Sequence, residues 1–206
     1  MFMKKVIIVT GGIGAGKSVV CEEFANLGAK VIQSDKVGHS CLQPQGAAYA
    51  ETVAAFGEQI LNPDGTINRQ KLGKVAFANR ENLVRLNAAT HKHILREIVD
   101  MVDKIQNQCD TDTKCVTPDV IVLEIPLFHA VDFSYDAVIS VIASETARIE
   151  RVLERGGITR EIAEAIMSLQ PSNEEYRSFA DYCIENDGDI EELRARAREI
   201  FNEIRL

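Results

Sequence analysis

The sequence predicts an α/β fold in which helices flank a five-stranded parallel β-sheet. The run Lys5–Thr10 is rich in β-branched residues and ends at a glycine pair, which is typical of a strand buried on both faces. A helix over Lys17–Leu27 and a strand over Ala29–Gln33 follow, and together they make one right-handed βαβ unit. Short apolar runs at Asp119–Ile125 and Ala137–Ile142 indicate two further strands.

Helical patterns account for most of the remaining chain. Helices are expected over Tyr49–Phe56, over Arg69–Phe77, and along a long stretch from Arg80. A charged helical hairpin, expected to be exposed to solvent, follows the fourth strand. The last strand is expected over Ala180–Ile184, and Leu193, Ala197, Ile200 and Ile204 then mark one face of a closing amphipathic helix.

The chain is expected to form a single domain, because 206 residues with 46% hydrophobic content suffice for one substantial core. We expect the core over residues 1–45, 116–147 and 179–206. A helical substrate-binding insertion would occupy residues 46–115, and a helical lid would occupy residues 148–178.

Composition excludes several classes of protein. The formal net charge of -8 argues against an extended nucleic-acid surface. The apolar run Val6–Val9 is too short for a membrane span, so no membrane partner is expected. The cysteines lack C-x-x-C pairing and are odd in number, which favours reduced thiols in the cytoplasm; they are Cys21, Cys41, Cys109, Cys115 and Cys183. The oligomeric state is left open.

The segment Gly11–Ser18 matches the phosphate-binding pattern G-x-x-x-x-G-K-[ST] and lies between a predicted strand and a predicted helix. In this pattern backbone N–H groups surround phosphate oxygens, the lysine bridges the β and γ phosphates, and the serine ligates Mg²⁺. The expected ATP ligands are Gly12, Ile13, Gly14, Ala15, Gly16, Lys17 and Ser18. The sequence therefore predicts a three-layer P-loop NTPase fold that uses ATP and Mg²⁺.

Two acidic residues lie at or just after the ends of predicted strands, and the sequence leaves two roles open for each. Asp35 follows the second strand, where it would serve as a general base or orient an acceptor hydroxyl; the alternative is an N-cap for a helix that begins at Lys36. Glu124 lies at the end of the third strand, where it would either hold Mg²⁺ through water or bond locally. The motifs that guanine-nucleotide switches require are misplaced or incomplete, which favours a kinase.

Arginines follow the fourth strand at helical spacing. Arg148, Arg151 and Arg155 share one helical face, as expected of a lid that closes over phosphate, and Gly156-Gly157 would supply its hinge. The alternative, a solvated helix whose charges pair locally, is stronger for Arg148 than for the other two.

Taken in order along nearly the whole chain, these motifs resemble the dephospho-CoA kinase family. The matching segments are Thr10–Ser18, Asp35, Asp64-Gly65 to Arg69, Leu86-Asn87 to His91, Pro126-Leu127, Arg151, Arg155, Gln170, and Ala180-Asp181 to Asn186 and Gly188. The family often has another acid where this chain has Gln33, and a glutamate where this chain has Ala130 after His129.

The resemblance implies ATP-dependent phosphorylation of the ribose 3′-hydroxyl of dephospho-CoA, the last step of CoA synthesis. Asp35 would activate the hydroxyl, while Lys17, Arg151 and Arg155 would stabilise the transferred phosphoryl group. Arg69 and His91 would hold the CoA-type substrate. From the residues alone, Arg69 fits a surface charge equally well, and His91 fits a histidine at the edge of the core.

Two alternatives remain open from the sequence. One is another small-molecule P-loop kinase that acts on a nucleoside monophosphate or a shikimate-like hydroxyl, because fold does not choose the acceptor. The other is a nucleotide-binding protein without turnover.

Overall fold

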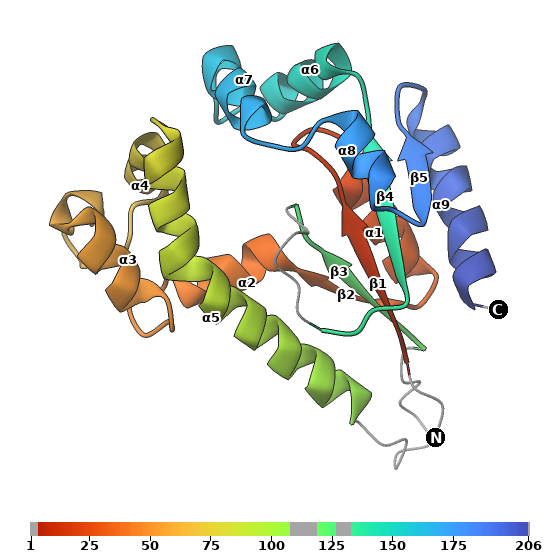
Figure 1. Cartoon of the computed structure of the whole chain (residues 1–206), viewed down its shortest axis with the longest axis horizontal. Helices are drawn as coiled ribbons and strands as arrows, with labels where there is room; N and C mark the ends of the chain where they lie inside the picture. Colours follow the sequence, from red (N-terminus) through yellow and green to blue (C-terminus); the bar gives the residue numbers. More distant parts are fainter. Residues whose placement is uncertain (1–3, 108–118, 127–132, 206) are drawn as a thin grey trace. The chain divides into compact units, whose positions relative to one another are not determined.

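The computed structural model describes residues 4–107, 119–126 and 133–205 (Figure 1). Cys109, Cys115, Leu127, His129 and Ala130 lie outside these residues. Within them five strands form one sheet. The strands are β1 (Lys5–Thr10), β2 (Lys30–Gln33), β3 (Val120–Glu124), β4 (Ala137–Ile142) and β5 (Tyr182–Glu185).

The sheet has the order β2-β3-β1-β4-β5, and every pairing is parallel, which confirms the predicted fold class. β1 occupies the centre, with Val9 opposite Glu124 of β3 and Thr10 opposite Ser140 of β4. Since all strands run in one direction, their carboxyl ends lie at one edge of the sheet, where ligands bind in open α/β folds.

Helices account for most of the other described residues. They are α1 (Lys17–Asn26), α2 (Ser34–Cys41), α3 (Tyr49–Phe56), the short 3₁₀ helix η1 (Glu58–Ile60), α4 (Arg69–Ala76), α5 (Arg80–Gln106), α6 (Glu145–Arg155), α7 (Arg160–Ser168), α8 (Asn173–Ser178) and α9 (Ile190–Arg205). The chain divides into two compact units. The first comprises Met1–Gln33 and Val102–Leu206, and the second comprises Ser34–Met101.

One face of the sheet in the first unit packs against α1 and α9. Alternate residues of the central strands, such as Ile7 and Val9, point to this face and are fully buried, as the period of two in a strand requires. Phe24 of α1 and Phe201 of α9 meet there with ring centroids 5.1 Å apart. Full burial of each such side chain contributes roughly 1.5–3 kcal/mol.

Helix α8 was not predicted from the sequence. Ser172 and Glu175 form a capping box at its start, so a new helix begins shortly after α7 ends. Tyr176 on α8 is fully buried; its carbonyl oxygen accepts a 2.7 Å hydrogen bond from Ser140 of β4, and its hydroxyl donates to the Pro126 carbonyl at 3.1 Å. Burial raises the pKa of Tyr176 to about 12, so the hydroxyl stays protonated.

The second unit has its own hydrophobic cluster, which consists of Phe56, Ile60, Ile67 and Leu72 with partly buried neighbours. A turn after Asn62 closes it: the Gly65 N–H donates to the Asn62 carbonyl at 3.0 Å, and Leu61 forms an antiparallel bridge with Ile67. Asn68 then caps α4 by accepting from the Lys71 N–H at 3.0 Å.

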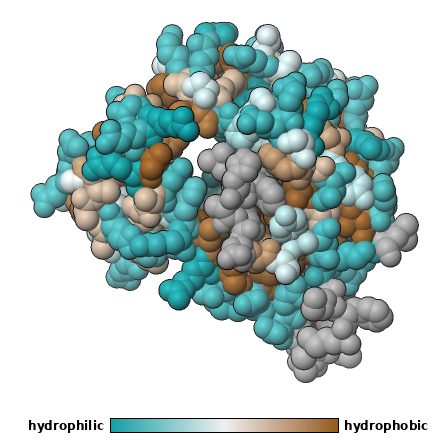
Figure 2. All heavy atoms as spheres, viewed as in Figure 1, coloured by the Kyte–Doolittle hydropathy of each residue, from teal (hydrophilic) through white to brown (hydrophobic). Residues whose placement is uncertain are grey.

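Hydrophilic residues cover most of the face shown in Figure 2. Among the described residues, the large hydrophobic side chains that are exposed are Val84, Tyr135 and Ile190. Within the same residues, no helix has the length and apolar character that a membrane crossing needs.

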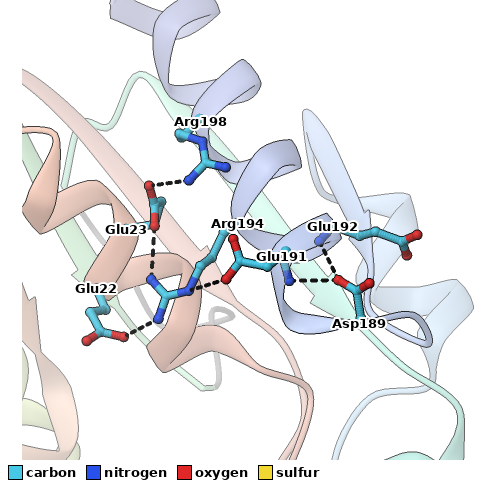
Figure 3. A network of polar contacts seen from close by, with 7 residues as sticks. All are labelled: Glu22, Glu23, Asp189, Glu191, Glu192, Arg194 and Arg198. Atoms are coloured by element: carbon cyan, nitrogen blue, oxygen red, sulfur yellow. Dashed lines mark hydrogen bonds and ion pairs between the residues drawn. The ribbon is translucent and has the colours of Figure 1, made fainter.

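A buried carboxylate joins α1 to α9 (Figure 3). Glu23 is 6% exposed, and its two oxygens accept hydrogen bonds from Arg194 at 3.0 Å and from Arg198 at 2.9 Å. Arg194 also reaches Glu22 at 3.1 Å. Desolvation raises the pKa of the Glu23 carboxyl, but the two arginines outweigh it and the net pKa is lowered. Glu23 is therefore ionised in the folded protein and fixes α9 against α1.

Replacing Glu23 by glutamine is expected to lower the free energy of unfolding at neutral pH by about 1–3 kcal/mol, because two arginines lose a charged acceptor. The folded-state pKa of Glu23 lies below the usual value of 4.5. Its contribution is therefore present above that value and is lost as the pH falls through the folded-state pKa. Urea unfolding at several pH values should show the wild type and Glu23→Gln converging in acid.

Glu22→Gln is the matched control, because Glu22 is the exposed neighbour on the same helix. This variant should lower the free energy of unfolding by no more than about 0.5 kcal/mol. Equal losses for the two variants would show that the Glu23 network does not stabilise the fold.

Candidate active site

The phosphate loop lies between β1 and α1, at the carboxyl edge of the sheet. Gly16 is the N-cap of α1, and no side chain caps this helix end. The first turn also lacks an acidic residue. No side chain therefore offsets the positive end of the helix dipole here, which favours an anionic ligand.

Glycine is required at position 16. Its φ of 107° lies in the left-handed region, and a β-carbon there would come within 2.3 Å of Asn186 Nδ2. Asn186 is buried and donates through Nδ2 to the Ala15 carbonyl at 2.7 Å. The residue that follows β5 thus holds the loop that follows β1.

Lys17 and Ser18 begin α1. The Lys17 ammonium donates to the carbonyl oxygens of Gly11 and Gly12, at 2.9 Å each, so the side chain curls back along the loop. Ser18 is exposed, and its hydroxyl makes no hydrogen bond within the described part of the chain.

Arg151 projects from α6 toward the end of β5. Its Nη2 atom donates to the Asn186 carbonyl at 2.8 Å and lies 3.4 Å from Asn186 Oδ1. Its Nη1 atom is buried without a hydrogen-bond partner among the described residues. A buried guanidinium nitrogen without an acceptor is costly, and a ligand oxygen would satisfy it.

A pocket of about 430 Å³ adjoins the loop and Arg151. Its lining residues are Gly16, Val19, Arg151, Glu154, Arg155, Asn186, Gly188, Ile190 and Leu193. Arg155 is the exposed last residue of α6, and the two glycines after it have positive φ values of 70° and 90°. The volume and the mixed apolar and cationic lining suit a nucleotide-sized ligand.

Sequence reasoning did not place Asn186 in the site. Its position directly after β5 was the available signal, since the same strand-end argument had selected Asp35 and Glu124.

Arg148 corrects an expectation. The hairpin of α6 and α7 was expected to be exposed, and a solvated helix was the alternative that applied most to Arg148, but this side chain is buried. Its Nε atom donates to the Ile13 carbonyl at 2.9 Å. The alternative of a solvated charge is therefore wrong for Arg148.

Glu124 bonds locally at the end of β3. Its Oε2 atom accepts a 2.7 Å hydrogen bond from the Gln33 amide on β2, so the residue that replaces the family's second acid pairs with this carboxylate. No group of three or more His, Cys, Asp and Glu side chains that could hold a metal occurs in residues 4–107, 119–126 and 133–205. The site instead offers one exposed hydroxyl, Ser18, with a strand-end carboxylate, which fits a Mg²⁺ ion that takes most of its ligands from water and phosphate.

Asp35 belongs to the second unit and is the second residue of α2, which begins at Ser34. The N-cap interpretation is therefore wrong, because Asp35 lies within the first turn. Its carboxylate is exposed and has no hydrogen bond or ion pair with other described residues. The chain places it two residues after the end of β2.

Arg69 and His91 also belong to the second unit. Arg69 is the exposed first residue of α4. His91 on α5 is half-buried, has no hydrogen-bond partner among the described residues, and has a pKa lowered by desolvation. It is therefore neutral at physiological pH.

Comparisons with known proteins agree with these features. A family model described as dephospho-CoA kinase matches residues 5–192. The dephospho-CoA kinase of Thermobifida fusca is 35% identical over 198 residues, which cover 95% of this chain and 94% of that protein. The protein TT1252 from Thermus thermophilus has a similar structure, with a TM-score of 0.75, 25% identity and 98% of each chain covered.

A second solved structure, the dephospho-CoA kinase from Campylobacter jejuni, has a TM-score of 0.60 and 27% identity, with 98% of each chain covered. The family match thus extends over the phosphate loop, the arginines of α6 and the strand-end residues. The chain belongs to the dephospho-CoA kinase family.

Proposed function

We propose that this protein transfers the γ-phosphoryl group of ATP to the ribose 3′-hydroxyl of dephospho-CoA and so produces CoA, the last step of CoA synthesis. The observation that carries the proposal is a phosphate loop joined to an arginine-lined pocket in a member of the dephospho-CoA kinase family. We further propose that the reaction takes place in the cytoplasm, without a nucleic-acid or membrane partner.

ATP would bind with its phosphates on the loop and its nucleoside in the adjoining pocket. Backbone N–H groups of the segment 12–18 would supply donors at the start of α1, which no side chain caps, whereas the Ile13 N–H donates to Gln170 Oε1. The pocket offers Val19, Ile190 and Leu193 as apolar contacts for a purine ring. Mg²⁺, bound through the Ser18 hydroxyl, would offset part of the phosphate charge.

The cations of this site would stabilise the phosphoryl group as it is transferred. Lys17 would exchange its two carbonyl acceptors for β and γ oxygens, since charged acceptors make stronger hydrogen bonds than neutral ones. Arg151 would direct its unpartnered Nη1 atom to the same charge. Arg155, beside two glycines, would join when the lid closes.

The second unit would hold the acceptor. The exposed carboxylate of Asp35 has no partner among the residues that the structure describes, and we propose that it takes the proton of the 3′-hydroxyl. A bond forms between the 3′-oxygen and the γ-phosphorus, and the bond from that phosphorus to the β,γ-bridging oxygen breaks. ADP leaves with the electron pair. Arg69 is exposed, and His91 has no hydrogen-bond partner among the described residues; both would bind the phosphate and polar groups of the CoA-type substrate.

ADP release in the presence of ATP and Mg²⁺ tests the acceptor. Dephospho-CoA is expected to support turnover, whereas a nucleoside monophosphate and shikimate are expected to give only the background rate. Turnover with another acceptor alone would keep the kinase chemistry but refute the dephospho-CoA proposal. ATP binding without turnover on any acceptor would indicate a nucleotide-binding protein.

Replacing Asp35 by asparagine is expected to lower kcat by about 10²–10⁴-fold, because the amide cannot accept the hydroxyl proton. The Kd for ATP should change little. Asp100→Asn is the matched control, since Asp100 is an exposed aspartate of the second unit without a described partner. A comparable loss of ATP affinity in Asp35→Asn would instead make Asp35 a metal ligand or a structural group.

A further inference from the structure

A closed set of hydrogen bonds surrounds one residue of the phosphate loop. The Ile13 N–H donates to Gln170 Oε1 at 2.8 Å, and the Ile13 carbonyl accepts from Arg148 Nε at 2.9 Å. Arg148 Nη2 donates to the same Gln170 oxygen at 3.1 Å. We call Ile13, Arg148 and Gln170 the Ile13 bracket. Both backbone polar groups of Ile13 are thus held by side chains.

The bracket joins the loop to two segments distant in sequence. Arg148 lies in the second turn of α6, and Gln170 follows the end of α7. A β-carbon at Gly12 would lie 2.2 Å from Arg148 Nη2, so the guanidinium packs directly against the loop backbone. Arg151 is one turn further along α6, so the orientation of the helix that carries it depends on this contact.

The charge of Arg148 has no carboxylate partner within hydrogen-bond distance in the described part of the chain. Its acceptors there are the carbonyl of Ile13 and the amide oxygen of Gln170, and both are neutral. At 7% exposure, no other described arginine or lysine is buried to the same degree. Removing a guanidinium from water with only neutral acceptors is costly, and an anion on the adjacent loop would offset that cost.

From this geometry we propose that Arg148 and Gln170 are positioning residues that hold Ile13 in the conformation in which the phosphate loop binds ATP. The role of Arg148 depends on its shape as well as its charge, because a planar guanidinium donates to two acceptors at once and an ammonium does not match that fork. The inference rests on the proposed use of ATP, and does not depend on the acceptor.

The competing explanation is that the bracket only stabilises the fold. Comparing the binding of ATP with that of adenosine distinguishes the two explanations, since adenosine lacks phosphates and does not need the loop. If Ile13 is positioned for phosphate, Arg148→Lys and Gln170→Ala should each weaken ATP binding by about tenfold or more and leave adenosine binding unchanged. The double variant should lose little more than the worse single variant, because the two residues act as a unit.

Gln170→Glu provides a second test of the proposal if the other variants fold poorly. A glutamate retains the size of the side chain and an acceptor for both donors, and it would form an ion pair with Arg148, so Tm should not fall. Its negative charge beside the loop should still weaken ATP binding by about tenfold. Arg160→Met, an exposed arginine on α7 paired with Glu164 at 3.7 Å, is the matched control and should bind ATP as the wild type does.

Isothermal titration with ATP and adenosine decides the outcome. Unchanged ATP affinity in Gln170→Glu, or parallel losses for ATP and adenosine in Arg148→Lys and Gln170→Ala, would overturn the proposal. Tighter ATP binding by Gln170→Ala would overturn it as well, since Gln170 would then occupy the place of a phosphate oxygen. A wild-type protein that binds no ATP would instead refute the proposed function.

Discussion

The central position of β1 is the constraint on which the first unit depends. β1 pairs with β3 on one side and β4 on the other, so its backbone groups are used within the sheet and its end is fixed. The chain leaves the sheet at Thr10 and enters the phosphate loop at once. Because neighbouring strands are parallel, Glu124 and Asn186 arrive at the same edge. Asn186, which follows β5, therefore holds the loop at Ala15 although it lies far away in sequence.

Two buried charged side chains in this unit have different kinds of hydrogen-bond partner. Glu23 is satisfied by arginines on α9, so its charge is balanced within the protein and serves packing. Within the described part of the chain, Arg148 donates its hydrogen bonds to neutral oxygens, so its positive charge favours an anion on the phosphate loop. This difference is physical: a paired ion contributes little field beyond its partner, whereas a cation among neutral acceptors favours an anion nearby.

Proteins catalyse phosphoryl transfer mainly by positioning the reactants and stabilising charge, and only to a small extent by covalent chemistry. The first unit holds the groups suited to the donor, among them Lys17 and Arg151. The second unit holds Asp35, Arg69 and His91, which are the groups proposed for the acceptor. Because the two groups belong to separate units, the donor site can keep the phosphate loop while the acceptor site determines which hydroxyl reacts. This agrees with the rule that function resides in sites and not in folds.

Sequence by itself determined the parallel α/β fold, the phosphate loop and the family, because strand burial, glycine spacing and helix caps are local signals that short segments carry. It also marked Arg151 by helical spacing. Tertiary structure alone decided that Arg148 is buried, that Asn186 holds the loop at Ala15, and that Gln170 contacts Ile13. These contacts join residues more than 130 positions apart, and the burial of a polar side chain depends on which distant segment covers it, which local periodicity does not encode.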